Sequence, residues 1–204
     1  MAASVVHISF RPSPQQEMQK ERITRKAQIR ILHTSDNHVG GEIVLKPQQA
    51  GRTGTCIALG LVVDKAKELD VDMLILAGDF IDNSRVNDRI LEETVSHLKR
   101  LDIPVVLVPG NHDQLDGKSV YHRRAFEGLP SNIFIVKGKN GNIINFDNLG
   151  VKVWARPTYD HTPDSRPIEQ VPPRQGSFWH IGVAHGFYVP LDEETDRSSP
   201  ISAA

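Results

Sequence analysis

Short apolar runs recur along the chain, and each is followed by polar residues and a glycine. The clearest run covers residues 105–108, which are apolar at every position and lead into Pro109 and Gly110. Such a run predicts a strand buried on both faces, as in the middle of a parallel sheet, because a half-exposed strand alternates apolar and polar residues. Three more short, largely apolar runs predict further strands at residues 29–34, 73–77 and 179–184.

Helical periodicity separates the first three of these runs. Apolar residues recur at the spacing of one helix face from Thr53 or Gly54 to about Leu69, and again from about Asp88 to Leu101. Strands that alternate with helices in this order predict right-handed crossovers and a parallel sheet. We therefore expect the first half of the chain to have an α/β fold.

The second half of the chain is less regular. A short helix is expected at residues 119–127, and three strands are expected at 133–136, 142–146 and 151–155. Turn-forming residues at 139–142 and 147–150 predict that these strands are joined as hairpins. The segments 156–176 and 187–204 show no periodicity and are expected to be loops.

The N-terminal residues differ from the rest of the chain in composition. They are polar, contain Pro12 and Pro14, and have too few apolar positions to bury a helix face. We therefore expect a mobile extension at residues 1–26, with a short charged helix at most over 16–26. One domain is expected over residues 27–204.

Composition and charge narrow the classes of function. The chain has 204 residues, of which 39% are hydrophobic and 24% charged, as in an ordinary globular domain. The net charge of -1 indicates no basic field for nucleic acid, although bound metals could supply local positive charge. One cysteine cannot form an internal disulfide, and no apolar run is long enough for a membrane span or a secretory signal. We therefore expect a cytoplasmic protein without membrane partners.

Side chains that can bind a metal follow each of the four apolar runs. Because the carboxyl ends of parallel strands meet at one edge of a sheet, these side chains are expected to converge where α/β sheets bind ligands. Each one alone is more easily explained as a loop cap or a turn residue. Their repeated position, with glycine beside them, favours a site. In chain order the candidates are Asp36 and His38, then Asp79, then Asn111, His112 and Asp113, then His185.

The candidate ligands mix oxygen and nitrogen donors, which suit Mn, Fe or Zn better than calcium. Two metals about 3.5–4 Å apart and bridged by one carboxylate are a recurrent device for phosphate ester hydrolysis, in which a metal-bound hydroxide attacks phosphorus. Asp79 follows the middle of three linked strands and is the natural bridge. We therefore expect two divalent ions, Mn before Fe or Zn, held by Asp36, His38, Asp79, Asn111 and His185.

The residues beside these ligands are candidates for other roles. His112 could donate a proton to the leaving oxygen of the substrate. Asp113 could orient His112 or support the metal ligands from behind. The predicted catalytic residues are therefore His112 and Asp113, and the predicted substrate contacts are Asn111 and His112.

Together these motifs resemble those of the calcineurin-like metallophosphoesterase superfamily over residues 29–186. The resemblance rests on Asp36-x-His38, Gly78-Asp79, Gly110-Asn111-His112-Asp113 and His185-Gly186. Residues 31–36 are most similar to the branch that contains DNA-repair exonuclease subunits. The resemblance implies a four-layer fold of two packed mixed sheets flanked by helices. It also implies that Asp36 and His38 hold one metal, Asn111 and His185 hold the other, Asp79 bridges them and His112 is the catalytic histidine.

One block of the family pattern is missing. A Gly-His-x-His block would follow His185 and supply one more ligand to each metal, but no histidine occurs after His185. This departure predicts weaker metal binding and a second sheet that lacks strands and has an exposed edge. A fragment, a shortened gene product and a degenerate domain would each explain it.

Three functions stay open on these grounds. The first is a metal-dependent phosphoester hydrolase, expected to act on diesters such as a nucleotide or nucleic acid. The second is a catalytically impaired or non-catalytic remnant of that domain, which the missing block favours. The third is a nuclease subunit that works with a partner ATPase, which the near-neutral charge does not support.

Overall fold

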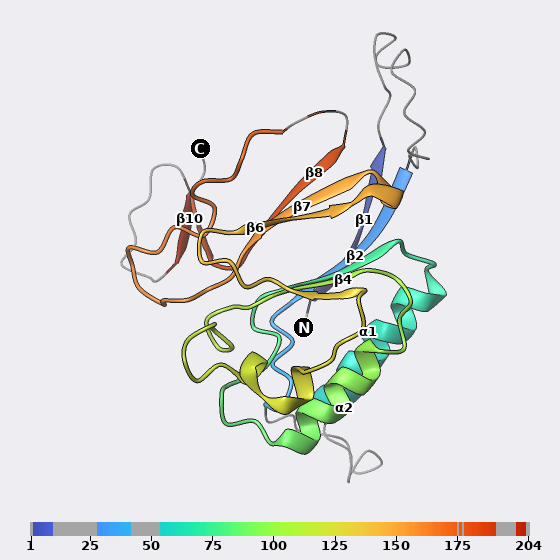
Figure 1. Ribbon diagram of the computed structural model, residues 1–204, viewed down its shortest axis with the longest axis vertical. Helices are drawn as coiled ribbons and strands as arrows, with labels where there is room; N and C mark the ends of the chain where they lie inside the picture. Colours follow the sequence, from blue (N-terminus) through green and yellow to red (C-terminus); the bar gives the residue numbers. More distant parts are fainter. Residues whose placement is uncertain are drawn as a thin grey trace.

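The computed structural model describes residues 2–9, 28–41, 54–174, 176, 178–190 and 199–202. Within these ranges two larger sheets pack face to face, and α1 (Gly54–Glu68) and α2 (Asp88–Leu98) cover the outer side of the first sheet (Figure 1). No helix in the described ranges combines the length and apolar character that crossing a bilayer requires.

The first sheet has five strands in the order β1-β2-β3-β4-β5. The strands from β2 to β5 are mutually parallel, α1 connects β2 to β3, and α2 connects β3 to β4. The alternation predicted from the apolar runs is therefore confirmed. The bounds are β1 (Ala2–Ser9), β2 (Gln28–Ser35), β3 (Met73–Ala77), β4 (Val105–Val108) and β5 (Ile133–Ile135).

The two central strands are buried at every residue, as their apolar runs predict. Alternate side chains of β3 enter different cores: Leu74 and Leu76 pack beneath the helices, whereas Met73 and Ile75 pack towards the second sheet. This division follows from the two-residue repeat of a strand. Because both faces are packed, the loops at the carboxyl ends of β3 and β4 begin from rigid positions.

The second sheet is mixed and has the order β6-β7-β8. Val151 and Val153 of β7 face the first sheet. They pack with Ile31 and Val106 in the core between the two sheets. The predicted α/β architecture of two packed mixed sheets is confirmed, and in the described ranges α-helices cover the first sheet only. The bounds are β6 (Asn142–Phe146), β7 (Val151–Arg156) and β8 (Trp179–Ala184).

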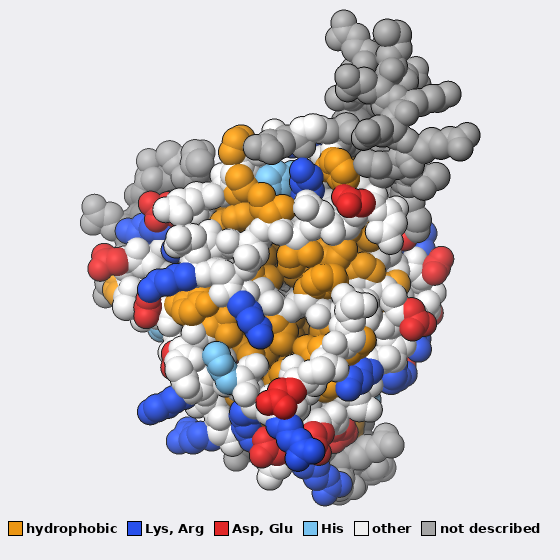
Figure 2. Space-filling view, in the orientation of Figure 1, with side chains coloured by type: hydrophobic (Ala, Val, Ile, Leu, Met, Phe, Trp, Pro, Cys, Tyr) orange, Lys and Arg blue, Asp and Glu red, His pale blue; other side chains and the backbone are white. Residues whose placement is uncertain are grey.

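The edges of the two sheets meet at an apolar groove of about 550 Å³, which β5 and β6 line together. Ile143 on β6 is 49% exposed beside it. Figure 2 shows hydrophobic side chains gathered over the middle of one face, with charged side chains of both signs towards the end where α1 and α2 lie. This face therefore carries no field of a single sign.

One predicted hairpin is wrong and the other is correct. β5 pairs in parallel with β4, whereas β6 belongs to the second sheet, so residues 136–141 carry the chain from one sheet to the other. Pairing along the buried edge of β4 determines this outcome, and Val136 extends it by donating to the carbonyl of Leu107. The turn at Asp147–Leu149 does join β6 to β7 as an antiparallel pair.

Three other segments also differ from the sequence predictions. Ala2–Ser9 forms β1, antiparallel to β2, where we expected a mobile extension, because the free edge of β2 offers backbone hydrogen bonds that need no apolar pattern. Residues 10–26 lie outside the described ranges. Two 3-10 helices replace the short helix at 119–127, since Ser119 and Arg123 each begin a separate turn. Part of the expected C-terminal loop forms β9 (Phe187–Val189) and β10 (Pro200–Ser202).

Candidate metal centre

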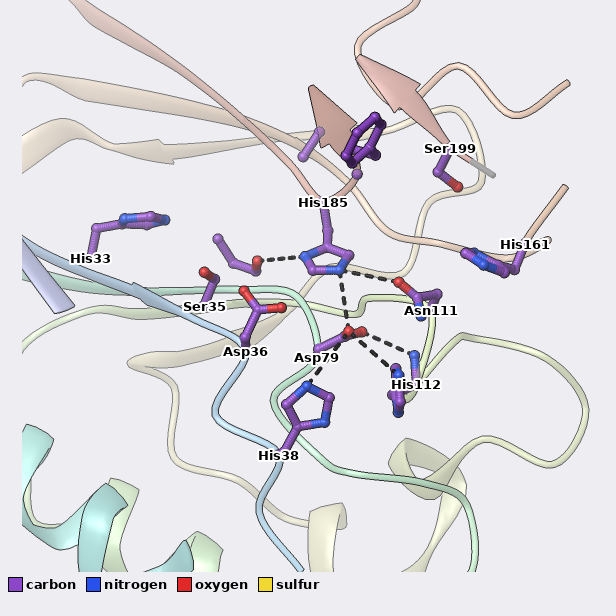
Figure 3. A pocket seen from close by; sticks show the side chains of 14 residues that line it. His33, Ser35, Asp36, His38, Asp79, Asn111, His112, His161, His185 and Ser199 are labelled. Carbon is purple, nitrogen blue, oxygen red and sulfur yellow. Dashed lines mark hydrogen bonds and ion pairs between the residues drawn. The ribbon is translucent and has the colours of Figure 1, made fainter. Parts of the chain in front are cut away.

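A polar pocket of about 530 Å³ opens at the carboxyl ends of β2, β3, β4 and β8 (Figure 3). Six of the seven predicted site residues line it and are therefore brought together from four separate strands. The seventh, Asp113, is buried behind the pocket. The lining residues with predicted roles are Asp36, His38, Asp79, Asn111, His112 and His185.

Asp79 is the centre of this cluster and is only 4% exposed. Its Oδ2 atom lies 3.3 Å from Nε2 of His185, 3.9 Å from Nε2 of His38 and 4.0 Å from Nε2 of His112. Its Oδ1 atom accepts a hydrogen bond of 2.9 Å from the backbone N–H of His112. One carboxylate oxygen is thus approached by the same ring nitrogen of three histidines.

The other ring nitrogen of each histidine is held by an oxygen acceptor. Nδ1 of His185 lies 3.1 Å from the carbonyl of Ala77, and Nδ1 of His112 lies 2.9 Å from the carbonyl of Asp82. A carbonyl can only accept, so Nδ1 carries the proton in both rings. Nδ1 of His38 similarly lies 3.2 Å from Oδ1 of Asp82. Each ring is therefore oriented with Nε2 as the nitrogen available to a metal.

The backbone of three ligand candidates has an unusual conformation. Asp36, His38 and Asp79 have φ angles of 53°, 46° and 49°, in the left-handed region that L residues rarely adopt. Hydrogen bonds hold this geometry, from Asp36 N–H to Gly78 carbonyl at 3.1 Å and from His38 N–H to Asp79 carbonyl at 2.9 Å. Strain of this kind persists only where surrounding contacts enforce it, and it is typical of functional sites.

Two glycines make room for the cluster. A Cβ atom at Gly78, whose φ is 87°, would lie 2.1 Å from the ring of His185. A Cβ at Gly110 would lie 2.3 Å from both the backbone nitrogen and Oδ1 of Asp79. Glycine therefore precedes Asp79 and Asn111 because candidate ligands from neighbouring strands occupy the space of a side chain.

The electrostatics of the cluster favour an ion pair between Asp79 and His185. Burial would raise the pKa of Asp79, but hydrogen bonds from His185 and the His112 backbone, with the charge of both rings, hold it below its usual value. Burial would lower the pKa of His185, but its hydrogen bond and charge interaction with Asp79 raise it. A divalent cation would replace the proton that this pair shares.

The donor atoms form two groups around a shared carboxylate. One group contains His38, Asp79 and His112, the other contains Asp36, Asp79 and His185, and the ligand atoms within each lie within 4.8 Å of one another. This mixed oxygen and nitrogen set fits two divalent ions with Asp79 between them. The grouping joins Asp36 to His185 rather than to His38, so the assignment of ligands to each metal stays a prediction.

Asp113 is a buried hydrogen-bond acceptor and does not line the pocket. It is 2% exposed, and its carboxylate accepts hydrogen bonds from the backbone N–H groups of Phe80, Ile81 and Gly110 and from the hydroxyl of Tyr121. Burial raises the pKa of Asp113. Asp113 thus links the loops after β3 and β4. The sequence suggested that Asp113 orients His112, but the contact with Nδ1 of His112 is made by the Asp82 carbonyl.

Several residues in or beside the pocket had no role assigned from the sequence. Asp82, three residues after Asp79, orients both His38 and His112, and its spacing was the available signal. Four residues that line the pocket have no motif to mark them, namely His33, His161, Phe187 and Ser199.

Two polar side chains at and after the end of β7 brace loops outside the pocket. Arg156 donates to the carbonyls of Lys139 and Arg166, and Tyr159 donates to the carbonyl of Lys137. Neither belongs to the lining of the pocket.

Comparison with known families agrees with this geometry. A model of the calcineurin-like phosphoesterase family matches residues 29–194, most of the chain. The chain belongs to the calcineurin-like phosphoesterase family. The resemblance seen in the motifs is thereby confirmed, and membership supports metal-dependent hydrolysis of phosphoester bonds as the class of chemistry.

The relatives found include DNA-repair proteins. The DNA double-strand break repair protein Mre11 of Haloferax volcanii is 30% identical over 176 residues, which are 82% of this chain and 37% of that protein. Mre11 of Archaeoglobus fulgidus is 29% identical over 129 residues, 59% of this chain and 29% of that protein. These matches support the DNA-repair branch indicated by residues 31–36. The chain spans about a third of the length of these curated relatives, between 29% and 37%.

Solved structures of similar proteins include a nuclease and a phosphatase. Pseudomonas putida nuclease MPE is 18% identical, with 84% of this chain and 73% of that chain covered and a TM-score of 0.36. A dimetal phosphatase from Danio rerio is 21% identical, with 40% of this chain and 29% of that chain covered and a TM-score of 0.32.

Proposed function

We propose that this calcineurin-like domain hydrolyses phosphodiesters with two divalent ions held around Asp79. The observation that carries the proposal is the approach of Nε2 of His38, His112 and His185 to one oxygen of Asp79. Two bound ions would polarise the phosphoryl group and activate a water molecule. The ligand set suits Mn, Fe or Zn, and we expect Mn to support activity best.

His112 is the residue that we assign to proton transfer. Its side chain is 46% exposed, and its Nδ1 contact with the Asp82 carbonyl keeps Nε2 directed towards Asp79 in the pocket. A histidine in this position can give a proton to the leaving alkoxide and regain one from water. Asn111, which also lines the pocket, would contact the phosphoryl oxygens.

The substrate class is proposed from the relatives. Mre11 is a DNA double-strand break repair protein, so a nucleotide or nucleic acid diester is the natural choice. The near-neutral chain supplies no basic field for DNA, which makes the metals the main source of positive charge in the pocket. A nuclease subunit that works with a partner ATPase stays an open alternative, and the cytoplasmic location expected from the sequence stays a prediction.

The test is hydrolysis of p-nitrophenyl methyl phosphate by protein stripped of metal and then supplied with Mn. We expect turnover that depends on Mn and that Asp79→Asn lowers to less than about a hundredth, since loss of a shared ligand should exceed the 10- to 100-fold effect of outer-shell changes. Asp102→Asn is the matched control, because Asp102 is exposed near the opposite end of β4.

A catalytically impaired domain is the second candidate. It is favoured by the small number of donors, because each group in the described ranges has three side chains and shares Asp79 with the other. It predicts weakly bound metal and no turnover at any Mn concentration. Metal content measured beside the rates separates this candidate from the first.

A further inference from the structure

The side of the pocket beyond Asn111 is built from three distant segments, represented by His161, Phe187 and Ser199, which we call the outer wall. In Figure 3 His161 and Ser199 lie on the Asn111 side of His185, whereas His33 and Ser35 lie on the other side. Phe187 N–H donates to the carbonyl of Ser199 at 3.0 Å, and Ser199 N–H donates to the carbonyl of Thr162 at 3.1 Å. Backbone hydrogen bonds therefore hold the outer wall together.

Ser199 is the first sign that the outer wall binds something. It is 3% exposed and has a φ of 54°, and its hydroxyl has no hydrogen-bond partner within the part of the chain that the structure describes. A buried hydroxyl without a partner is unfavourable, and it is uncommon in native structures. Ser199 also lines the pocket, so this unsatisfied group lies in the pocket wall.

Phe187 is the second sign, because an apolar ring is placed beside a metal-type cluster. Phe187 lines the pocket and is 39% exposed, and it lies two residues after His185, at most about 7 Å along the chain. Gly186 lets this segment pack against Ser199, since a Cβ there would lie 2.3 Å from the Ser199 carbonyl. Phe187 thus lines the same pocket in which a phosphate would bind.

The charge of the pocket indicates which ligand the outer wall fits. The acidic residues of the lining, Asp36 and Asp79, belong to the metal cluster, and the described lining contains no Lys or Arg. The outer wall offers an aromatic ring, an imidazole and a hydroxyl. Such a surface stacks on a flat neutral ring and bonds its polar edge, whereas a second phosphate would find no counter-charge there.

We propose that the outer wall binds the nucleobase of a phosphodiester substrate, with Phe187 stacking on the base and Ser199 contacting its edge. This proposal rests on the proposed function, because it positions the base relative to a phosphate held at Asp79. Phe187 and Ser199 are thus specificity residues that favour nucleotides over simple alkyl diesters.

The test compares two substrates that share a leaving group. The p-nitrophenyl ester of thymidine 5′-monophosphate carries a base, and p-nitrophenyl methyl phosphate carries none. We expect a higher kcat/KM for the thymidine ester, and Phe187→Ala should lower it about tenfold while changing the methyl ester less than about twofold. Tyr188→Ala is the matched control, since Tyr188 is the neighbouring aromatic residue, is 61% exposed and does not line the pocket. Equal rates on both esters, or an equal loss on both in Phe187→Ala, would overturn the proposal.

A binding measurement keeps the proposal testable if no ester is hydrolysed. 2-Aminopurine riboside 5′-monophosphate loses fluorescence when its base stacks, so we expect quenching on the Mn-loaded wild type and on Tyr188→Ala. Phe187→Ala should bind about tenfold more weakly. Quenching without turnover refutes the proposed function and supports the base subsite. Absence of quenching refutes the subsite, whatever the rates on the methyl ester.

Discussion

The carboxylate of Asp82 lies 3.2 Å from Nδ1 of His38, while Nε2 of the same ring faces Asp79. Asp82 also accepts, through its backbone carbonyl, from His112. A partner behind a ligating histidine fixes the ring and raises its basicity. We therefore predict that Asp82→Ala lowers the affinity for Mn about 10- to 100-fold without unfolding the protein.

Titration of the metal-free protein with Mn, followed by the electron paramagnetic resonance signal of free Mn²⁺, measures this change in affinity. Asp82→Asn is the matched variant, because its amide oxygen can still accept from His38. We expect it to recover most of the affinity. Equal affinity in the wild type and Asp82→Ala would show that Asp82 does not act through the histidine.

A second prediction concerns Gly78. Gly78→Ala places a Cβ atom 2.1 Å from the His185 ring at a φ of 87°. The left-handed backbone alone costs roughly 1–2 kcal/mol for an L residue, and the displaced ring would remove one ligand. We expect lower stability in urea together with loss of Mn binding. Gly117→Ala is the control, since a Cβ there meets nothing within 4 Å and should leave both properties unchanged.

Much of the fold could be predicted because local pattern and final burial agree. The runs that became β3 and β4 are apolar and were located to the residue, since their sequence alone favours a position buried on both faces. The less apolar run that became β8 was also located to the residue, although this strand is partly exposed. The hairpin expected between 133–136 and 142–146 failed because a turn at Asn140 and Gly141 fits two topologies. Only the tertiary pairing of β5 with β4 distinguishes between them.

The site residues likewise divide into those that the sequence predicts and those that it does not. Asp36, Asp79 and His185 stand at strand ends, so a motif and a sheet edge suffice to bring them together. His161 and Ser199 reach the pocket through contacts between distant segments, which leave no periodic signal. The role of Asp113 depends on its burial, which its position beside His112 does not reveal.

The third prediction follows from the burial of Asp113. Asp113→Ala would leave the backbone N–H groups of Phe80, Ile81 and Gly110 without their acceptor, which should lower the free energy of unfolding by about 3 kcal/mol or more. Tyr121→Phe removes one donor to the same carboxylate and should lower it by about 1 kcal/mol. Urea denaturation measures both. An Asp113→Ala protein with wild-type stability and no activity would show instead that Asp113 takes part in the chemistry.

The fourth prediction concerns pH and the Asp79–His185 pair in the metal-free protein. The lowered pKa of Asp79 gives stability that is present above its unfolded pKa and lost as the pH falls through its folded pKa. The raised pKa of His185 gives stability that is present below its unfolded pKa of 6.5 and lost as the pH rises through its folded pKa. The pair therefore stabilises the metal-free protein most in mildly acidic solution.

Metal affinity should be low in mildly acidic solution, where the metal-free protein is stabilised most, because a ligating histidine must lose its proton. We expect Mn affinity to rise with pH and to keep rising above pH 6.5, since the pKa of His185 is raised. Calorimetry in two buffers of different ionisation enthalpy counts the protons released. His185→Gln should release fewer protons than the wild type at pH 6.5, and equal release would exclude His185 as the group that titrates.

The last prediction separates proton donation by His112 from a role as a metal ligand, because Nε2 lies 4.0 Å from Oδ2 of Asp79 and could serve either. A donor matters most when the leaving group is a poor one. His112→Gln should slow hydrolysis of a dialkyl diester by about 10²- to 10⁴-fold. The p-nitrophenyl diester should lose much less, since p-nitrophenolate leaves without a proton. If both esters slow equally and Mn content falls, His112 is a ligand and another group must protonate the leaving oxygen.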